Sequence, residues 1–446
     1  MVILYKQNVV LSIDIIDKFA IIMAGIQYYF LKKYKMRSTK MKKKITIAVI
    51  GCGGFARNFV PLFKAHKYVE KVYVCDLIRS RAEDYKNKFG VEIIDSLEDA
   101  LKSDEITAIA CFAQRHLHGP IVTSALKAGK DVYSAVPMAS SVEECKEIID
   151  LVKETGRMYM MGETCVYYPC AMYCKQEYEK GTFGNFVYGE SQYFHDLSHF
   201  PSDFKNDRPN SAVPPFFYPT HSTAMLLYAT DSHVTKVTGV GYRDVEENTP
   251  FKKGENPWDN EFSNEYSLMQ LSNGGTARVC ECRRIGYKAP SSFISGFYGT
   301  QGAYQYNNAQ HLVTKLTPSG VELRDVSDEV NPYAMTEHKN DADFKNKVAN
   351  HVWAGNDMSP VQQKNRDDRN LSEDYLKIPV GHMYSHGLLI DDFCTAAYER
   401  KLPLVNAWNA ARYTVPGLIA HESALRGGEL MDVPDFGDPE DIYSGT

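Results

Sequence analysis

A glycine-rich turn directly after a buried apolar run limits the possible folds of this chain more than any other feature. Residues 45–50, Ile-Thr-Ile-Ala-Val-Ile, form a continuous run rich in β-branched side chains. Such runs are typical of strands that are covered on both faces in a parallel sheet. Gly51-Cys-Gly-Gly-Phe-Ala56 follows at once, and residues 55–64 then have helical spacing of apolar side chains. This order predicts the first strand, turn and helix of a doubly wound α/β sheet.

The same alternation of strand and helix patterns continues to residue 163. After the first unit we expect five further strands, at 71–75, 91–94, 107–112, 131–134 and 157–161. Among the helices between them we expect 79–89, 119–128 and 143–154. Gly90 follows the first of these helices, and Ser141 with Glu144 has the pattern of a capping box before the last. We therefore predict that residues 41–163 form a Rossmann domain.

The glycine turn has the spacing that a bound dinucleotide requires. Gly51 permits the tight turn, Gly53 lets the backbone approach a pyrophosphate, and Ala56 allows close packing of helix on strand. Asp76 ends the second strand, where its carboxylate can accept hydrogen bonds from ribose hydroxyls. A 2′-phosphate would be repelled there, so we expect NAD rather than NADP, although nearby arginines, Arg81 among them, weaken this preference. The alternative is a glycine turn that binds no ligand.

Length, charge and cysteine content narrow the class of protein. A chain of 446 residues is long enough for two or three domains. Its formal net charge of −6 does not favour nucleic acid or an anionic membrane as a partner. Ten cysteines are scattered along the chain without any CxxC pair, which indicates reduced thiols and a cytoplasmic location.

The first forty residues differ from the rest of the chain. An uncharged, mostly apolar run of thirteen residues at 19–31 is followed by basic residues. The run is shorter than the roughly 20 residues that span a bilayer, and a signal peptide would carry its positive charge before it. We expect residues 1–40 to be an upstream extension, disordered or mis-started, with Met41 as the natural beginning. A weak membrane anchor is the alternative.

Five short segments together resemble the Gfo/Idh/MocA family of sugar-type oxidoreductases, over roughly residues 43 to 435. They are Ile47–Gly53, Ala128–Val132, Pro137–Ala139, Lys180–Gly184 and Gly299–Gly302. The resemblance implies a second, α+β domain at 164–435, built on a large, mostly antiparallel sheet that covers the nicotinamide and binds a small-molecule carbohydrate. It also implies a homodimer or homotetramer. Residues 436–446 would be a tail.

The resemblance adds to the residues expected to contact the cofactor. Ala113 and His118 follow the fourth strand, Pro137 follows the fifth, and Glu163 ends the sixth, where family members reach the nicotinamide. Glu163 could instead be a solvent-exposed carboxylate. The expected cofactor-binding residues are therefore Gly51, Gly53, Gly54, Phe55, Ala56, Asp76, Arg81, Ala113, His118, Pro137 and Glu163.

Several polar residues of the family pattern are replaced. The usual Glu-Lys-Pro signature reads Ala135-Val136-Pro137, so the lysine that orients substrate and assists proton transfer is missing. Val166 and Phe217 stand where the family often has Arg and Asp, and Arg115 stands where it has Asn. These replacements put the family's ordinary mechanism in doubt, but not its cofactor.

Three residues remain as catalytic candidates. The family histidine is retained as His221, in Tyr218-Pro-Thr-His221, and histidine titrates near the pH at which a hydroxyl proton must be removed. It could also be a hydrogen-bonded core histidine. Tyr167 and Tyr168 could each relay a proton or stack on a sugar. No metal is expected, although His195, Asp196 and His199 form a cluster that could bind a metal or a sugar.

These features leave three functions open. The first is NAD-dependent oxidation or reduction of a secondary alcohol of a sugar, glycoside or cyclitol. The second comes from a branch of the family: redox-neutral glycosidases that retain NAD, oxidise a sugar hydroxyl transiently and eliminate the aglycone. The Tyr-Pro-Thr-His segment resembles that branch. The third is a dinucleotide-binding sensor that has lost catalysis.

In the second domain, alternating apolar residues and a hairpin signal at Asn273-Gly274 predict strands. These are 186–194, 234–242, 266–271, 276–281 and 294–298. Helices are expected at 223–229, 382–400 and 407–426. His382 and His386 would share one face of the second of these helices. Residues 325–376 are polar and charged, and would form a lid, an oligomer arm or a disordered insert.

Overall fold

The computed structural model describes residues 43–197, 202, 206–286, 291–307, 310–330, 359–378, 382, 384–439 and 443. Residues 44–446 form one compact unit, to which every element below belongs. The expected extension at 1–40, His199 and most of the insert expected at 325–376 lie outside the described residues. Within the described part of the chain, no helix is long and apolar enough to cross a membrane.

The first sheet is the expected parallel Rossmann sheet. Its six strands lie in the order β3-β2-β1-β4-β5-β6, and each neighbouring pair is parallel. Their bounds are β1 Ile45–Ile50, β2 Val69–Cys75, β3 Glu92–Ile93, β4 Ala108–Cys111, β5 Asp131–Ser134 and β6 Tyr159–Met161. From β1 the chain adds β2 and β3 on one side and then β4 to β6 on the other, so the strand order reverses between β1 and β4. A ligand crevice is therefore expected at the carboxyl ends of these two parallel strands.

The helices of this domain begin and end largely where the sequence predicted. They are α2 Val60–Ala65, α3 Arg79–Phe89, α4 Leu97–Lys102, α5 His118–Lys127 and α6 Val142–Thr155. Gly90 caps α3 in the left-handed conformation, and the Ser141 hydroxyl accepts the Glu144 amide at the start of α6. In a capping box the Glu144 carboxylate would in turn accept the Ser141 amide. Here it accepts the amide of Ser140 instead.

The expectation of one continuous helix over 55–64 is wrong. A short 3-10 turn, η1 Ala56–Asn58, comes first, and α2 starts only at Val60. The physical reason is Pro61, which has no amide hydrogen to continue a helix from the preceding turn and is tolerated only in a first helical turn. The glycine loop is therefore followed by a 3-10 turn and not by a regular helix.

The second sheet has nine strands and is antiparallel except where β10 pairs with β7. Its order is β14-β13-β12-β11-β7-β10-β9-β8-β15. The bounds are β7 Phe186–Phe194, β8 Val234–Arg243, β9 Phe262–Leu271, β10 Thr276–Cys282, β11 Ser291–Gly299, β12 Gly302–Tyr306, β13 His311–Thr317, β14 Gly320–Asp325 and β15 Met431–Asp432. Asn273-Gly274 forms the expected hairpin between β9 and β10. Sequence analysis did not find β12, β13, β14 and β15.

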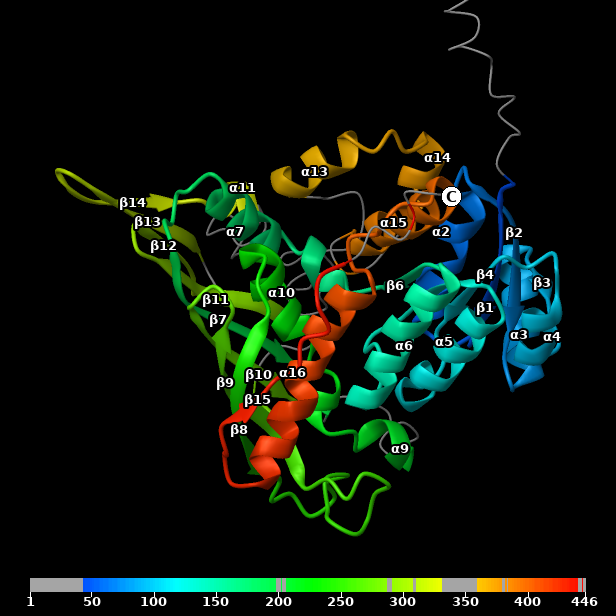
Figure 1. Cartoon of the computed structure of the whole chain (residues 1–446), viewed down its shortest axis with the longest axis horizontal. Helices are drawn as coiled ribbons and strands as arrows, with labels where there is room; N and C mark the ends of the chain where they lie inside the picture. Colours follow the sequence, from blue (N-terminus) through cyan, green and yellow to red (C-terminus); the bar gives the residue numbers. More distant parts are fainter. Residues whose placement is uncertain are drawn as a thin grey trace, which may run out of the picture. The chain divides into compact units, whose positions relative to one another are not determined.

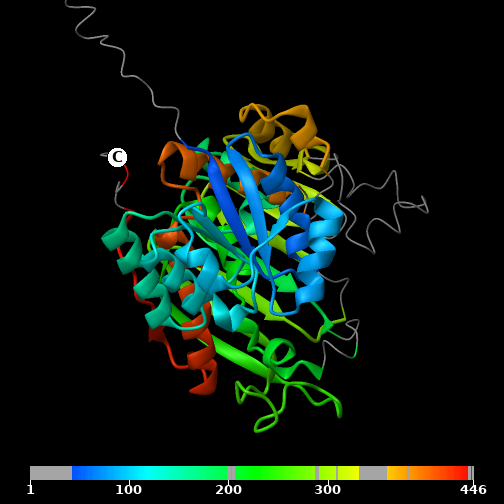
Figure 2. The same cartoon turned by 90° about the vertical axis from the view of Figure 1, so that its right-hand side faces the viewer.

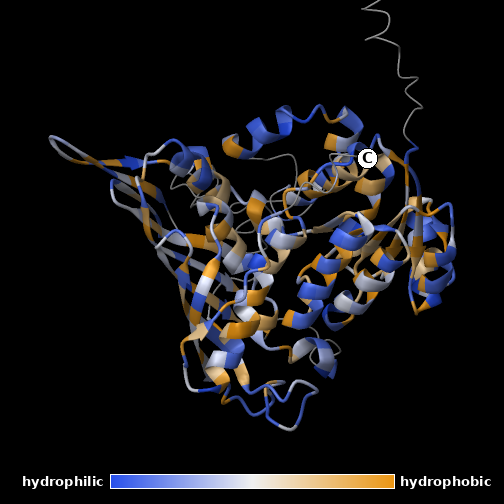
Figure 3. Ribbon diagram, in the orientation of Figure 1, coloured by the Kyte–Doolittle hydropathy of each residue, from blue (hydrophilic) through white to orange (hydrophobic). Residues whose placement is uncertain are grey.

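Helices lie between the two sheets, so that both share one hydrophobic core (Figures 1 and 2). They are η3 Thr164–Tyr167, α7 Pro169–Glu179, α10 Thr220–Thr230, α15 Ser385–Glu399 and α16 Ala407–Leu425. Helix α16 packs on β8 and also contacts α6 of the first domain. Hydrophobic residues gather where α10 and α16 meet the sheet (Figure 3). A domain boundary at 163/164 stays a prediction.

The insert expected at 325–376 stays a prediction, and one further expectation is corrected. The described parts of 325–376 include three short helices, α11 Ser327–Val330, α13 Pro360–Asp367 and α14 Glu373–Leu376. His382 does not lie in the following helix, because α15 starts at Ser385 and the backbone is left-handed at His382 and Tyr384. The rings of His382 and His386 nevertheless meet, with centroids 4.6 Å apart.

Candidate active site

The glycine loop is built around a conformation that only glycine adopts without strain. Gly51 has φ of +100°, and its amide donates to the Cys75 carbonyl over 2.8 Å. A Cβ atom at Gly51 would lie 2.6 Å from the carbonyl oxygen of Phe112 and 3.0 Å from the Ala113 nitrogen. The loops after β1 and β4 therefore touch at this point, and any side chain would force them apart.

The following residues leave space on the other side of the loop. A Cβ atom at Gly53 or Gly54 would meet no heavy atom within 4 Å. From the protein side, the Tyr85 hydroxyl of α3 donates to the Gly53 carbonyl over 2.5 Å. Phe55 is 37% exposed, and Ala56 is buried under the loop. The loop is thus anchored from below and open where a diphosphate would approach it.

Asp76 lies at the end of β2 with its carboxylate fixed by the backbone. One carboxylate oxygen accepts the Cys52 amide over 2.7 Å, and the other accepts the Ile78 amide over 2.8 Å. The side chain is only partly buried, so each oxygen can accept a further hydrogen bond from a ribose hydroxyl. Arg81 is exposed in the first turns of α3, while Arg79 is paired with Asp95 over 2.6 Å.

His118 connects the loops that contain Ala113 and Pro137. His118 is buried, with Nδ1 2.7 Å from the Pro137 carbonyl and Nε2 3.1 Å from the Ala113 carbonyl. Burial lowers the pKa of His118, so the neutral ring donates to one carbonyl only, for which the closer Pro137 oxygen is the better acceptor. His118 thus ties the loops after β4 and β5 together, which is a positioning role.

These loops fit a dinucleotide. The open space over Gly53 and Gly54 admits a diphosphate, and the fixed Asp76 carboxylate has acceptor capacity for a ribose. The three loops after β1, β4 and β5 meet at the point where the strand order reverses. This is the position at which doubly wound sheets bind their ligands.

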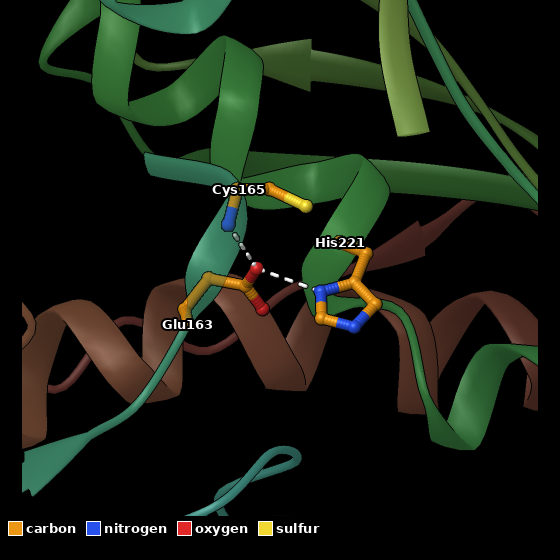
Figure 4. A group of neighbouring side chains, drawn as sticks. All are labelled: Glu163, Cys165 and His221. Atoms are coloured by element: carbon orange, nitrogen blue, oxygen red, sulfur yellow. Dashed lines mark hydrogen bonds and ion pairs between the residues drawn. The ribbon is translucent and has the colours of Figure 1, made fainter. Parts of the chain in front are cut away.

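Glu163 and His221 form a buried pair beside this edge of the sheet. Glu163 directly follows β6 and Gly162, and His221 lies in the first turn of α10. One Glu163 oxygen is 2.7 Å from His221 Nδ1 and also accepts the Cys165 amide over 2.8 Å (Figure 4). Glu163 is 0% exposed and His221 5%. The alternative of a solvent-exposed carboxylate at Glu163 is therefore wrong.

The charge state of Glu163 follows from its neighbours. Burial raises the pKa of this carboxyl, but the His221 imidazole, together with Thr220 and the Cys165 amide, outweighs burial, and the pKa lies below its ordinary value. Glu163 is thus a carboxylate at neutral pH and accepts from Nδ1–H of His221. The other ring nitrogen, Nε2, points away from Glu163 (Figure 4) and is the one available for proton transfer.

Two tyrosines that sequence analysis did not single out frame His221. The rings of Tyr193 on β7 and Tyr218 before α10 meet the imidazole edge-on, with centroids 4.9 and 5.1 Å away. Arg115 lies 4.4 Å over the Tyr218 ring, and Arg283 lies 5.0 Å over the Tyr193 ring. Tyr218 belongs to the Tyr-Pro-Thr-His segment, whereas Tyr193 and Arg283 reach the site only through the pairing of β7 with β10.

The two tyrosines expected as proton relays have different surroundings. Tyr167 donates to Asp392 and accepts from Arg369 over 2.7 Å, so its hydroxyl is part of a buried ion-pair network. It makes no hydrogen bond to His221 among the described contacts. Tyr168 is buried, and burial raises its pKa well above the ordinary value, with Cys165, Tyr193 and Glu163 acting in the same direction. Glu163 thus lies close enough to Tyr168 to raise the pKa of its hydroxyl.

Glu163, Cys165 and His221 also carry ligand-type atoms within 4.8 Å of one another. One Glu163 oxygen and His221 Nδ1 are bonded to each other, and burial raises the pKa of the Cys165 thiol well above its ordinary value. A protonated thiol is a poor metal ligand. The absence of a metal stays a prediction. In the other cluster, His195 is bonded to the Tyr193 hydroxyl and Asp196 to the Ile285 amide.

Comparisons with known proteins agree with this geometry. The oxidoreductase family with an NAD-binding Rossmann fold, Gfo/Idh/MocA, matches residues 45–163. A "Glycosyl hydrolase family 109 protein" from Streptomyces filamentosus is 23% identical over 93% of this chain and 79% of its own length.

Two solved structures share the fold of nearly the whole chain. Levoglucosan dehydrogenase in complex with NADH and levoglucosan has a TM-score of 0.68 at 17% identity and is aligned over 88% of this chain and 100% of its own. Myo-inositol 2-dehydrogenase from Lactobacillus plantarum has a TM-score of 0.62 at 17% identity, with the same coverage of both chains. At such identities the likeness establishes the fold. Residues 45–163 thus match the NAD-binding Rossmann domain of the Gfo/Idh/MocA oxidoreductase family.

Proposed function

We propose that this chain is an NAD-dependent oxidoreductase that acts on a secondary alcohol of a sugar, glycoside or cyclitol. The observation that carries the proposal is the buried His221–Glu163 pair directly after β6, on the carboxyl edge of the NAD-binding sheet. Ligands of doubly wound sheets bind at this edge. A histidine held by a carboxylate is a common arrangement for removing a proton near neutral pH.

The chain's own residues divide into two groups in this proposal. Gly51, Gly53, Gly54, Phe55 and Ala56 would hold the diphosphate and Asp76 the adenosine ribose, which favours NAD over NADP. Arg81 and the loops that His118 joins, at Ala113 and Pro137, would line the remainder of the cofactor site. Glu163 is bonded to His221 through one oxygen, and its contact with the cofactor stays a prediction.

When bound, NAD accepts a hydride from the carbon that carries the substrate hydroxyl. His221 removes the hydroxyl proton through Nε2, because Nδ1 is held by Glu163. The Glu163 carboxylate fixes the tautomer of the ring and stabilises the imidazolium that forms. In the reduction direction the same nitrogen returns the proton. The pair thus replaces the proton acceptor that is lost where Val136 stands in place of the family lysine.

The names of similar proteins support the substrate class. Two structural relatives are called levoglucosan dehydrogenase and myo-inositol 2-dehydrogenase, so one acts on an anhydrosugar and one on a cyclitol. Both substrates are ring compounds with secondary hydroxyls. The aromatic faces of Tyr193 and Tyr218 beside His221 suit such rings.

A redox-neutral glycosidase is the second candidate, and a specific observation favours it. The relative aligned over 93% of this chain is named a family 109 glycosyl hydrolase. In such a reaction a sugar hydroxyl is first oxidised to a ketone, which acidifies the neighbouring C–H. The aglycone leaves by elimination, water adds in its place, and the ketone is reduced, so no net oxidation occurs. His221 would then remove and return the same proton.

The experiment that separates the two candidates uses NAD-saturated protein. It is incubated with a panel of sugars, inositols and nitrophenyl glycosides while NADH absorbance and nitrophenol release are followed together. NADH that accumulates with a sugar or inositol supports the dehydrogenase. Nitrophenol release without NADH supports the glycosidase. The absence of both signals across the panel would leave the non-catalytic sensor and refute the proposal.

We also propose that the protein acts in the cytoplasm as a homodimer or homotetramer, without nucleic acid or membrane as a partner. The neighbouring strands β8 and β9 of the nine-stranded sheet carry the exposed apolar side chains Val240 and Leu268. An exposed apolar patch of this kind commonly marks a protein–protein contact. Light scattering on the purified chain would test the assembly, and a monomer at micromolar concentration would contradict it.

A further inference from the structure

Two guanidinium groups lie on the aromatic frame around His221. Arg115, in the 3-10 turn η2 Arg115–Leu117 after β4, lies 4.4 Å over the Tyr218 ring. Arg283, directly after β10, lies 5.8 Å from the same ring and 5.0 Å from Tyr193. Both tyrosine rings contact His221 edge-on. Each guanidinium therefore contacts a tyrosine ring that also contacts the proposed base, His221.

The acidic groups of this region are already paired with other residues. Glu163 is bonded to His221 over 2.7 Å, and Glu281 is bonded to Arg283 over 3.0 Å. Arg115 has no carboxylate within ion-pair distance among the described residues, and its one described hydrogen bond runs to the Asn210 carbonyl over 3.4 Å. The guanidinium of Arg115 is thus the uncompensated charge of the site.

The charged guanidinium of Arg115 is partly removed from water, which costs free energy unless a counter-ion binds it. Its side chain is partly buried, and burial lowers the pKa of the guanidinium, with Arg283 acting in the same direction. The burial of Glu281 raises the pKa of that carboxyl to about 8, which weakens its charge as a partner of Arg283. A partly desolvated guanidinium forms strong bidentate contacts with planar or tetrahedral anions.

We propose that Arg115, supported by Arg283, binds an anionic group of the substrate, so that this site acts on an acidic carbohydrate. The group would be a carboxylate, as in a uronic acid, or a sulfate or phosphate ester. The inference rests on the proposed function, because it names the substrate class of the same site. Arg115 and His221 both contact the Tyr218 ring, so the anionic group would bind close to the reacting hydroxyl.

The position of Arg115 favours the substrate over the cofactor as its partner. Arg115 faces Tyr218 and the Asn210 carbonyl, both contributed by the second domain. The diphosphate is expected at Gly53 and Gly54, at the start of the first βα unit. An arginine that held the cofactor would change NAD affinity when removed, so cofactor binding serves as an internal control.

The test is calorimetric titration of NAD-saturated protein with matched ligands. The set consists of a neutral hexose, the corresponding hexuronic acid, its 6-sulfate and its 6-phosphate. We expect at least one of the anionic members to bind about 10- to 100-fold more tightly than the neutral hexose, the range of a charge-assisted bidentate contact. The member that binds best identifies the anionic group.

Substitution of the guanidinium sharpens the test. Arg115→Asn should reduce the ratio of anionic to neutral affinity at least 10-fold, and Arg115→Lys should reduce it less. Arg426→Asn, which removes an exposed arginine paired with Glu422 at the end of α16, is the charge-matched control and should keep the ratio. NAD titration of each variant checks that the cofactor site is intact.

The outcomes distinguish failure of this inference from failure of the proposed function. If the neutral hexose binds as well as every anionic member, or if Arg115→Asn keeps the ratio, the inference is wrong while the proposed function stands. If no member of the set and no ligand of the wider sugar panel binds or reacts, the inference and the proposed function both fail.

Discussion

Two buried glutamate–histidine pairs in this molecule have the same hydrogen-bond geometry and different surroundings. In each, a carboxylate oxygen lies 2.7 Å from Nδ1, between Glu163 and His221 and between Glu265 and His421. The first pair stands after β6 at the edge of the NAD-binding sheet, with two tyrosines against the imidazole. In the second, the other Glu265 oxygen accepts the Phe216 amide over 2.7 Å.

The comparison teaches that pair geometry alone does not indicate chemistry. Glu265 and His421 join β9 to α16, and Glu265 also holds the Phe216 amide in the segment that leads to His221. Their described hydrogen bonds therefore have a structural role. Both imidazoles leave Nε2 without a described hydrogen bond, but only His221 lies next to the loops that fit a dinucleotide. Position relative to the cofactor, rather than the pair itself, makes the first a candidate for proton transfer.

The largest expected effect separates the two histidines. His221→Ala should lower kcat/KM about 100- to 10,000-fold, because a positioned acid–base group contributes that much. His421→Ala is the matched control: it leaves a buried glutamate without its partner in the same way, which costs of order 3 kcal/mol of stability. Steady-state kinetics and denaturant unfolding of both variants provide the measurement. Equal losses of activity in the two would remove the distinction.

The next effect concerns the two glutamates. Glu163→Gln should lower kcat/KM about 100-fold with little change in NAD affinity, because an amide no longer stabilises the imidazolium and can hold the wrong tautomer. Glu265→Gln should change kcat/KM less than about 10-fold, because Gln can still accept the Phe216 amide. The kinetic constants are measured beside NAD titrations. A larger kinetic loss in Glu265→Gln would reverse the comparison.

The buried carboxylates of the site should make stability depend on pH in opposite directions. Glu163 has a lowered pKa, so its contribution is present above its unfolded-state pKa of about 4.5 and is lost as pH falls through the folded value. The burial of Glu281 raises its pKa to about 8, so its contribution is complete below about 4.5 and is lost as pH rises toward 8.

Unfolding at two pH values tests this contrast. From pH 5 to pH 7, Glu281→Gln should gain about 2 kcal/mol relative to the unsubstituted protein, because Gln cannot lose a proton. Glu163→Gln should show no such gain over the same interval, and should instead lose less stability than the unsubstituted protein below pH 4.5. A pH-independent difference for Glu281→Gln would contradict the assignment.

The smallest effect distinguishes the two adjacent tyrosines. Tyr167→Phe removes a hydroxyl bonded to Asp392 and Arg369, and should cost about 1 to 2 kcal/mol of stability with activity within threefold. Tyr168→Phe removes a hydroxyl in the surroundings of Glu163, and should reduce activity more than stability if Tyr168 relays a proton. Activity and urea unfolding are compared for the two. A reversed pattern would assign the relay to Tyr167.

The first domain could be predicted because its function is encoded locally. The glycine loop, strand-end Asp76 and the βα alternation are each readable within a few residues, and the parallel sheet is as expected. The helix after the loop was misjudged at Pro61, where apolar spacing was given more weight than the missing amide hydrogen.

The second domain was harder for a physical reason. Strand β14 is exposed along its whole length, so the alternation of Val321 and Leu323 with charged residues marks no buried face, and β13 is only partly buried. The partners of His221 come from residues 58 positions away in the chain and from β7, so only tertiary structure brings them together. Glu163 was found as a site residue, but with the cofactor as its expected partner.

The central claim is that the glycine loop and Asp76 hold NAD beside His221. Calorimetric titration of cofactor-free protein with NAD tests it most directly, with Asp76→Ala and His221→Ala measured in parallel. The account predicts saturable binding to the unsubstituted protein and to His221→Ala, and an affinity at least 10-fold weaker for Asp76→Ala, which loses charged acceptors for the ribose. No heat with the unsubstituted protein, or equal affinity for Asp76→Ala, would contradict it.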